Sequence, residues 1–254
     1  MHTPTPLSGS NFFVILQAMA RFDFKQFSVD DTGCGMKICS DSVLLGAWFL
    51  PAHAEARSVV DAGAGSGVLA LMAAQICADA AVTGVEIVPE ACAAAAANFA
   101  ASPWADRLEV CAGDFRTVDL PAPVDLIISN PPYFTEGEIA PDKARAAARH
   151  QQTLTFGELL RRSRSLLAPQ GRLGLVAPAE AEASILFEGE MAGLKLRRLC
   201  RVLTTPGKQP RRVLMDFAAS DGPVETTTLH LREPNGSLAD VYRRLVDPFY
   251  LKIS

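Results

Sequence analysis

Short apolar runs alternate with segments of helical periodicity along most of this 254-residue chain. Apolar residues that recur every three or four positions predict helices, and compact apolar runs between glycine-rich or polar turns predict strands. Helices are expected over residues 41–50, 67–78, 89–101, 155–168, 180–192 and 237–246, and strands over 59–62, 81–86, 108–113, 124–129, 172–176, 196–204 and 212–218. This alternation implies an α/β fold, a mostly parallel sheet with helices on both faces, whose last two strands pair antiparallel.

The first of the central strands, 59–62, runs into a turn with glycine at alternate positions, Gly63, Gly65 and Gly67. Alternate glycines leave the backbone open to a ligand and let the next helix pack closely on the strand. A dinucleotide-binding fingerprint needs its last glycine one residue later, where this chain has Val68. The turn is therefore predicted to bind a nucleotide-like ligand, and Val68 weighs against a dinucleotide.

Three successive strands each end at an acid. Asp61 would meet an ammonium group or order the loop, and Glu86 is suited to hold the two hydroxyls of a ribose. Asp114 would accept a hydrogen bond from an adenine amino group, with Phe115 stacked on the adenine ring. Each acid alone is more often a turn or helix cap, but together they predict a ligand site at the edge where open α/β sheets bind ligands.

The strand at 124–129 is followed by the tetrapeptide Asn130-Pro131-Pro132-Tyr133. The Asn130 side-chain oxygen and a backbone carbonyl held by the two prolines can each accept a hydrogen bond from a planar amine. Tyr133 supplies a flat face for an aromatic or amide plane. An Asx-Pro turn is the competing interpretation, but its weight falls because the tetrapeptide follows a strand in a chain with a nucleotide-binding turn.

At these positions the chain resembles the class I S-adenosylmethionine-dependent methyltransferases, in the branch that carries Asn-Pro-Pro-Tyr and methylates planar nitrogens. The resemblance implies a Rossmann-like sheet and S-adenosyl-L-methionine as cofactor. It also implies roles by position. Residues 61–67 match the methionine-binding loop, Glu86 matches the ribose acid, Asp114 matches the adenine acid, and residues 130–133 match the catalytic loop, in which Asn130 also borders the cofactor.

The flanks resemble the bacterial valine tRNA (adenine-37-N6)-methyltransferase family. The resembling segments are Phe24-Lys25-Gln26-Phe27, residues 36–48, the 206–213 hairpin and Asp247-Pro248-Phe249-Tyr250-Leu251. This resemblance implies tRNA as the partner. It also implies that Lys37 and Asp41 belong to a lid over the cofactor and acceptor. An equal alternative is that Lys37 is a surface lysine and that Asp41 is the N-cap of a helix beginning at Ser42.

Charge is divided unevenly along the chain, although the net charge is only −4. Residues 1–142 carry 6 Lys and Arg against 17 Asp and Glu, whereas residues 143–254 carry 18 against 11. A polyanion would be attracted to the second part. The predicted RNA-binding residues are Arg145, Arg149, Lys208, Arg211 and Arg212. Solvated helix faces and edge-strand charges are the alternative explanation.

Composition, with 49% hydrophobic residues, is typical of one compact domain, predicted over 21–254 after a flexible lead-in at 1–20. The apolar run in that lead-in lacks a preceding Lys or Arg, so a signal peptide is not expected, and no segment predicts a membrane span.

The six cysteines form no C-x-x-C and the four histidines are dispersed, so we expect reduced thiols and no metal. These features favour a cytoplasmic protein; a monomer is expected, although the sequence does not determine the oligomeric state. Residues 135–153 are predicted to be a flap over the acceptor site or a short helix.

Other functions fit parts of the same pattern. The tetrapeptide would also suit a methyltransferase that acts on a glutamine amide of a release factor or on a base amine of rRNA. A nucleotide-binding dehydrogenase, or a cofactor-binding protein without methyltransferase activity, represents a different class. Val68 and residues 130–133 weigh against the dehydrogenase, and the basic second half favours RNA over a release factor.

Overall fold

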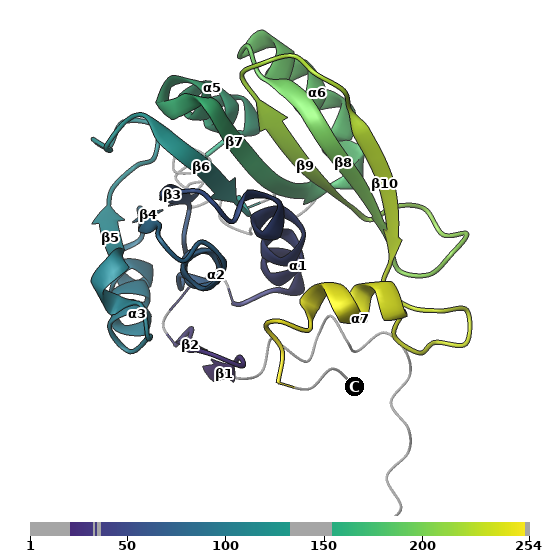
Figure 1. Cartoon of the computed structure of the whole chain (residues 1–254), viewed down its shortest axis with the longest axis horizontal. Coiled ribbons are helices and arrows are strands. Elements are labelled where there is room, and N and C mark those ends of the chain that lie inside the picture. The colour runs from purple at the N-terminus through teal and green to yellow at the C-terminus, as the bar shows by residue number, and fades with distance from the viewer. Residues whose placement is uncertain (1–20, 33, 35–36, 133–153, 252–254) are drawn as a thin grey trace, which may run out of the picture.

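The computed structural model describes residues 21–32, 34, 37–132 and 154–251. The predicted lead-in at 1–20, the predicted flap at 135–153, Tyr133, Arg145 and Arg149 lie outside these residues. Among the described residues, eight strands form one sheet in the order β10-β8-β9-β7-β6-β3-β4-β5, and β1 and β2 form a separate hairpin (Figure 1).

The central strands are parallel. The strands of the sheet are β3 (Ser58–Ala62), β4 (Ala81–Glu86), β5 (Leu108–Ala112), β6 (Val124–Ser129), β7 (Leu167–Pro178), β8 (Lys195–Leu203), β9 (Arg212–Ala218) and β10 (Glu225–His230). β3 pairs in parallel with β4 and β6, and β5 and β7 extend the parallel pairing on either side. β9 runs antiparallel to both β7 and β8, which confirms the predicted antiparallel pair. The turns that follow β3, β4, β5 and β6 therefore lie at one edge of the sheet.

Helices cover both faces of the sheet. They are α1 (Ser40–Phe49), α2 (Val68–Ile76), α3 (Pro89–Ala100), α5 (Phe156–Leu166), α6 (Glu182–Met191) and α7 (Asp240–Val246), with 3-10 turns η2 (Leu50–His53), η3 (Ala105–Arg107) and η4 (Ala179–Ala181). α1, α2, α3 and α7 pack into one buried apolar cluster, and α5 and α6 pack into a second on the opposite face (Figure 1). No helix in the described part of the chain is long and apolar enough to cross a membrane.

Each predicted helix is confirmed, with ends that differ by at most three residues. Capping explains the start of α5: the Thr155 hydroxyl accepts a hydrogen bond from the Glu158 backbone N–H, and the Glu158 carboxylate accepts one from the Thr155 backbone N–H. β7 begins at Leu167, five residues before its predicted range of 172–176. Two strand features were not predicted at all. β10 is an edge strand whose Thr226-Thr227-Thr228 run is exposed, so it lacks the apolar pattern that marks a buried strand.

The hairpin of β1 (Arg21–Asp23) and β2 (Ser28–Asp30) is the second unpredicted feature, and it packs on the C-terminal segment. The Lys25 backbone N–H donates to the Phe249 carbonyl at 2.7 Å. The Phe24 ring stacks between those of Phe27 and Tyr250, with ring centroids 4.5 and 5.9 Å away. Residues 24–27 and 247–251, which both resemble the tRNA methyltransferase family, are thus in contact although they lie near opposite ends of the chain.

Candidate active site

The glycine turn has the backbone conformation that its sequence predicts. Gly63, Gly65 and Gly67 all have positive φ angles, of 79°, 56° and 85°. A Cβ at Gly67 would lie 2.4 Å from the Phe99 ring, so this glycine allows α3 to pack on the turn. A Cβ at Gly63 or Gly65 would meet no atom within 4 Å. Their backbone is therefore open to a ligand.

Asp61 is fully buried beneath this turn. Its Oδ2 accepts a hydrogen bond from the Ala70 N–H at 3.0 Å, whereas its Oδ1 is buried with no partner among the described residues. Burial raises the pKa of Asp61 to about 7. A buried carboxylate oxygen without a partner is costly, and an ammonium group would supply both the hydrogen bond and the opposite charge. The site therefore fits the amino group of an amino-acid moiety.

Glu86, at the end of β4, is buried and organises the neighbouring loops. Its Oε2 accepts from the Gly65 N–H at 2.8 Å, and its Oε1 accepts from the Ile87 and Val88 N–H groups at 2.9 and 2.8 Å. A carboxylate has about four acceptor positions, so a further donor such as a ribose hydroxyl can still be accommodated. The carboxylate thus fixes the glycine turn against β4, and its predicted ribose contact stays a prediction.

Ile87 and Val88 were not among the predicted site residues, but their exposure makes them candidates for the site. Both side chains are 41% exposed, directly after the acid that ends β4. The signal was present in the sequence, since two aliphatic residues follow the strand where a polar turn is usual. They offer an apolar surface for a planar ring beside the glycine turn.

At the end of β5, the structure separates the two predicted adenine contacts. The Arg116 guanidinium donates to both Asp114 oxygens and holds the pKa of that carboxyl below its usual range. Arg116 also donates to Glu158 on α5 at 3.2 Å. Phe115 is only 4% exposed and packs in the second apolar cluster. The prediction that its ring stacks on adenine is corrected, because a ring enclosed by core side chains has no free face.

Asn130 follows β6, next to the glycine turn. Ser129 Oγ donates to the Ala62 carbonyl at 2.7 Å, which ties the end of β6 to the end of β3. The Asn130 amide nitrogen donates to Ser42 Oγ at 2.8 Å and to Cys39 Sγ at 3.1 Å. Pro131 is buried and Pro132 is half-buried. The structure therefore brings Asn130 to the sheet edge that carries Asp61 and Glu86, as predicted.

Lys37 and Asp41 both have protein partners. Lys37 Nζ lies 3.0 Å from Oδ1 of Asp31, which is fully buried, and also donates to the Asp31 carbonyl. Asp41 Oδ2 accepts from Arg212 Nε at 2.6 Å. The alternative role of Asp41 as an N-cap is wrong, because α1 begins at Ser40 and Asp41 lies in its first turn. A lid function for either residue stays a prediction.

The predicted RNA-binding cations differ in their surroundings. Arg212 is committed to Asp41, whereas Lys208 and Arg211 are exposed and make no ion pair within the described ranges. Several other cations of the basic part are paired internally: Arg172 with Asp216, Arg201 with Glu182, Arg161 with Glu188 and Lys195 with Glu190. Part of the basic excess is therefore neutralised by acidic side chains of the same fold.

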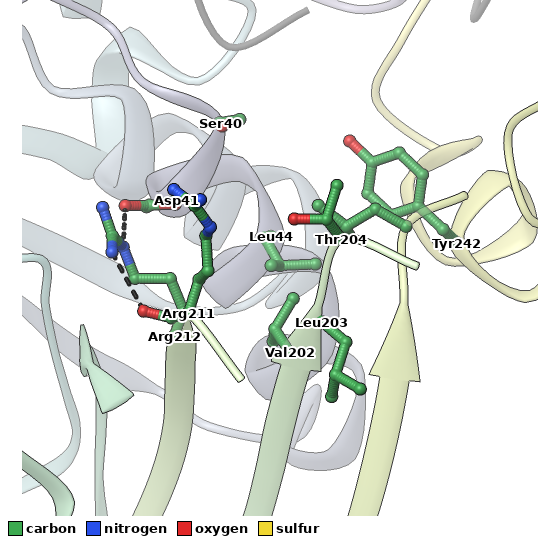
Figure 2. A pocket seen from close by; sticks show the side chains of 10 residues that line it. Ser40, Asp41, Leu44, Val202, Leu203, Thr204, Arg211, Arg212 and Tyr242 are labelled. Atoms are coloured by element: carbon green, nitrogen blue, oxygen red, sulfur yellow. Dashed lines mark hydrogen bonds and ion pairs between the residues drawn. The ribbon is translucent and has the colours of Figure 1, made fainter. Parts of the chain in front are cut away.

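Arg211 and Arg212 border a small pocket between the first turn of α1 and the ends of β8 and β9. Figure 2 shows both arginines on the Asp41 side, with Leu44, Val202 and Leu203 beneath and Tyr242 on the far side. Ser42, which holds Asn130, is the next residue after Asp41. The pocket and the contact to Asn130 therefore share the first turn of α1.

The sheet order, the open glycine turn and the polar side chains at the carboxyl edge define a class I methyltransferase fold. Residues 34–196 match the methyltransferase small domain family, and the chain belongs to it. The chain is thereby identified as an S-adenosylmethionine-dependent methyltransferase, and the alternative of a nucleotide-binding dehydrogenase is excluded.

Individual relatives narrow the assignment. The chain is 40% identical over 240 residues to the tRNA1(Val) (adenine(37)-N6)-methyltransferase of Porphyromonas gingivalis, with 90% of this chain and 94% of the relative covered. It is 41% identical over 234 residues to the protein of the same name from Tolumonas auensis, with 92% and 98% covered. A crystal structure titled as a predicted O-methyltransferase from Agrobacterium tumefaciens has a TM-score of 0.64 at 20% identity, covering 82% of this chain and 96% of that one. The chain belongs to the family of the two tRNA methyltransferases, and the crystal structure supports the fold.

Proposed function

We propose that this chain transfers a methyl group from S-adenosylmethionine to N6 of an adenine in tRNA, and that adenine 37 of valine tRNA is the target. The observation that carries the proposal is the placement of Asn130 beside the glycine turn, with its amide nitrogen held by α1. The names of the relatives supply the base and the tRNA.

The cofactor site is formed by the carboxyl ends of β3 and β4. Asp61 would bind the amino group through Oδ1, which has no partner among the described residues, and the backbone of Gly63 and Gly65 would border the methionine part. Glu86 would accept hydrogen bonds from the ribose hydroxyls, and Asp114 would accept one from the adenine amino group. Ile87 would provide the apolar surface for the adenine ring. The bound cofactor supplies a methyl group on a sulfonium, and the electrons of the broken C–S bond remain on sulfur.

Asn130 and Pro131 orient the acceptor. The Asn130 side-chain oxygen and the Pro131 carbonyl would each accept one hydrogen of the adenine amine, which localises the nitrogen lone pair toward the methyl group. Tyr133 would stack against the base. The nitrogen loses one proton to solvent as its bond to the methyl carbon forms. Positioning alone can supply roughly 7–11 kcal/mol of barrier reduction, so this mechanism needs no dedicated base.

Lys208 and Arg211 are the described cations best placed to meet the RNA backbone. Both are exposed and make no ion pair within the described ranges, and Arg211 lines the pocket at the first turn of α1, the turn that also contacts Asn130 through Ser42 (Figure 2). Arg145 and Arg149, which follow the catalytic loop in the sequence, stay predicted RNA contacts. Arg212 is assigned to the fold because of its bond to Asp41. With tRNA as substrate, we place the protein in the cytoplasm, as a monomer of one domain over residues 21–254.

The test is methyl transfer to two transcripts of valine tRNA that differ only in adenine or guanine at position 37. The cofactor carries a labelled methyl group, and digestion to nucleosides identifies the product. We expect N6-methyladenosine from the adenine transcript and no label in the other. Equal labelling of both would contradict the target position. Label found only in rRNA, or in a release-factor peptide containing glutamine, would contradict the tRNA assignment.

A further inference from the structure

The amide of Asn130 is anchored by a helix that is distant in sequence. Its nitrogen donates to Ser42 Oγ at 2.8 Å and to Cys39 Sγ at 3.1 Å. Ser42 lies in the first turn of α1 and is buried, and Cys39 is the residue that precedes this helix. Both hydrogens of the amide nitrogen therefore have acceptors on the same helix end.

This anchor matters because the two ends of a carboxamide have opposite roles. Only the carboxamide oxygen can accept a hydrogen bond from the amine that is to be methylated. The carboxamide nitrogen carries hydrogens itself, so it would repel the hydrogens of that amine. The nitrogen and oxygen are fixed in one plane, so holding the nitrogen against α1 also sets the direction of the oxygen. Ser42 provides the stronger acceptor, because a sulfur accepts hydrogen bonds weakly.

The position of Ser42 is itself fixed from a second side. The preceding residue, Asp41, accepts from Arg212 Nε at 2.6 Å, so the first turn of α1 is joined to β9 as well as to Asn130. A rigid support is what a side chain needs if its orientation is to be preserved during substrate binding.

We propose that Ser42 is a positioning residue for methyl transfer, which holds the Asn130 carboxamide with its oxygen toward the acceptor amine. This proposal rests on the role given to Asn130 in the proposed function. It predicts that loss of the Ser42 hydroxyl slows methyl transfer without weakening the binding of S-adenosylmethionine, since Ser42 acts on the acceptor side of the site.

The first experiment compares Ser42→Ala with Ser163→Ala, using single-turnover transfer to the valine tRNA transcript at saturating cofactor. Ser163 is a matched control, since it is also a buried helical serine, and its hydroxyl has no partner in the described part of the chain. We expect about a tenfold lower rate for Ser42→Ala, the effect of one hydrogen bond, and the wild-type rate for Ser163→Ala. Cofactor affinity by calorimetry and the melting temperature should stay close to wild type in both. Ser42→Thr keeps the hydroxyl and should recover most of the rate.

A double-mutant cycle separates this proposal from the proposed function. If Ser42 acts only through Asn130, adding Ser42→Ala to Asn130→Ala should cause no further loss of rate. The positioning role would be overturned if Ser42→Ala had the wild-type rate, or if the loss of rate in the double variant equalled the product of the two single losses. In either case Asn130 would remain catalytic. Wild-type transfer by Asn130→Ala would instead overturn the proposed function itself. If Ser42→Ala unfolds, Ser42→Cys takes its place in the cycle with the same criteria.

Discussion

Arg212 Nε donates to Asp41 Oδ2 at 2.6 Å and so joins the start of β9 to the first turn of α1. The two residues are 171 positions apart in the chain. The Asp41 side chain is only 10% exposed, and that of Arg212 is 31% exposed. The pair holds the end of α1 from which Ser42 reaches Asn130. An arginine that sequence alone assigns to RNA binding therefore has a structural role next to the acceptor site.

Arg212→Ala should lower the stability of the fold. The substitution leaves a mostly buried carboxylate without this partner, which costs about 1–3 kcal/mol in the free energy of unfolding. Urea unfolding measures the change. Arg211→Ala is the matched control, because Arg211 is exposed and makes no ion pair within the described ranges. Equal unfolding free energies for the Arg212 variant and wild type would show that the pair does not stabilise α1.

Arg211→Ala combined with Lys208→Ala should weaken RNA binding without changing cofactor affinity. Each lost phosphate contact lowers the slope of log affinity against log salt by about one, because fewer counterions are released on binding. Binding of labelled valine tRNA across a salt series measures both quantities. Arg164→Ala controls for net charge, since Arg164 is an exposed cation in the last turn of α5. If Arg164→Ala reduced RNA affinity as much as the double variant does for each charge removed, a localised RNA site at Lys208 and Arg211 would be ruled out.

Local sequence patterns predicted the central sheet and the glycine turn because both depend on residues close together in the chain. The positive φ angles follow from glycine at 63, 65 and 67, and the buried strands follow from their apolar runs. β10 could not be predicted in this way, because an exposed strand at a sheet edge needs no apolar face. Its pairing with β8 depends on tertiary structure.

The acceptor site shows the same limit. The Asn-Pro-Pro-Tyr motif identified Asn130, but its contact with Ser42 joins residues 88 positions apart and no periodicity marks it. Phe115 was assigned to the ligand from its position after an acid, whereas the packing of α5 against the sheet placed its ring in the core. The direction of a side chain at a strand end is decided by the layers around it, which a single local pattern does not determine.

The binding of S-adenosylmethionine should depend on pH through Asp61. Burial raises the pKa of Asp61 to about 7, so without cofactor this carboxyl contributes stability that is present below its unfolded value of 3.8 and is lost as the pH rises through about 7. In the proposed site the ammonium group of the cofactor would bind the ionised carboxylate, so affinity should increase as Asp61 loses its proton.

Calorimetry from pH 6 to 8 on wild type and Asp61→Asn tests this dependence. The amino group of the cofactor also titrates in this region, and the variant retains that contribution. The difference between the two profiles therefore isolates Asp61. We expect the variant to bind more weakly at pH 8 and to lack the rise in affinity around pH 7. Parallel profiles would remove Asp61 from the cofactor site.

Asn130→Ala should reduce methyl transfer by orders of magnitude and leave cofactor affinity nearly unchanged. The hydrogen bonds that localise the amine lone pair act mainly in the transition state, so their loss appears in the transfer rate and not in the binding of S-adenosylmethionine. Single-turnover rates at saturating cofactor measure the first quantity and calorimetry the second. Tyr133→Phe should retain much of the rate, because stacking needs the ring and not the hydroxyl. Tyr133→Ala should lose roughly 1–3 kcal/mol of base stacking. If folded Asn130→Ala transferred methyl at the wild-type rate, the amine would have to be oriented by other groups, and the Asn-Pro-Pro loop would no longer support adenine as the acceptor.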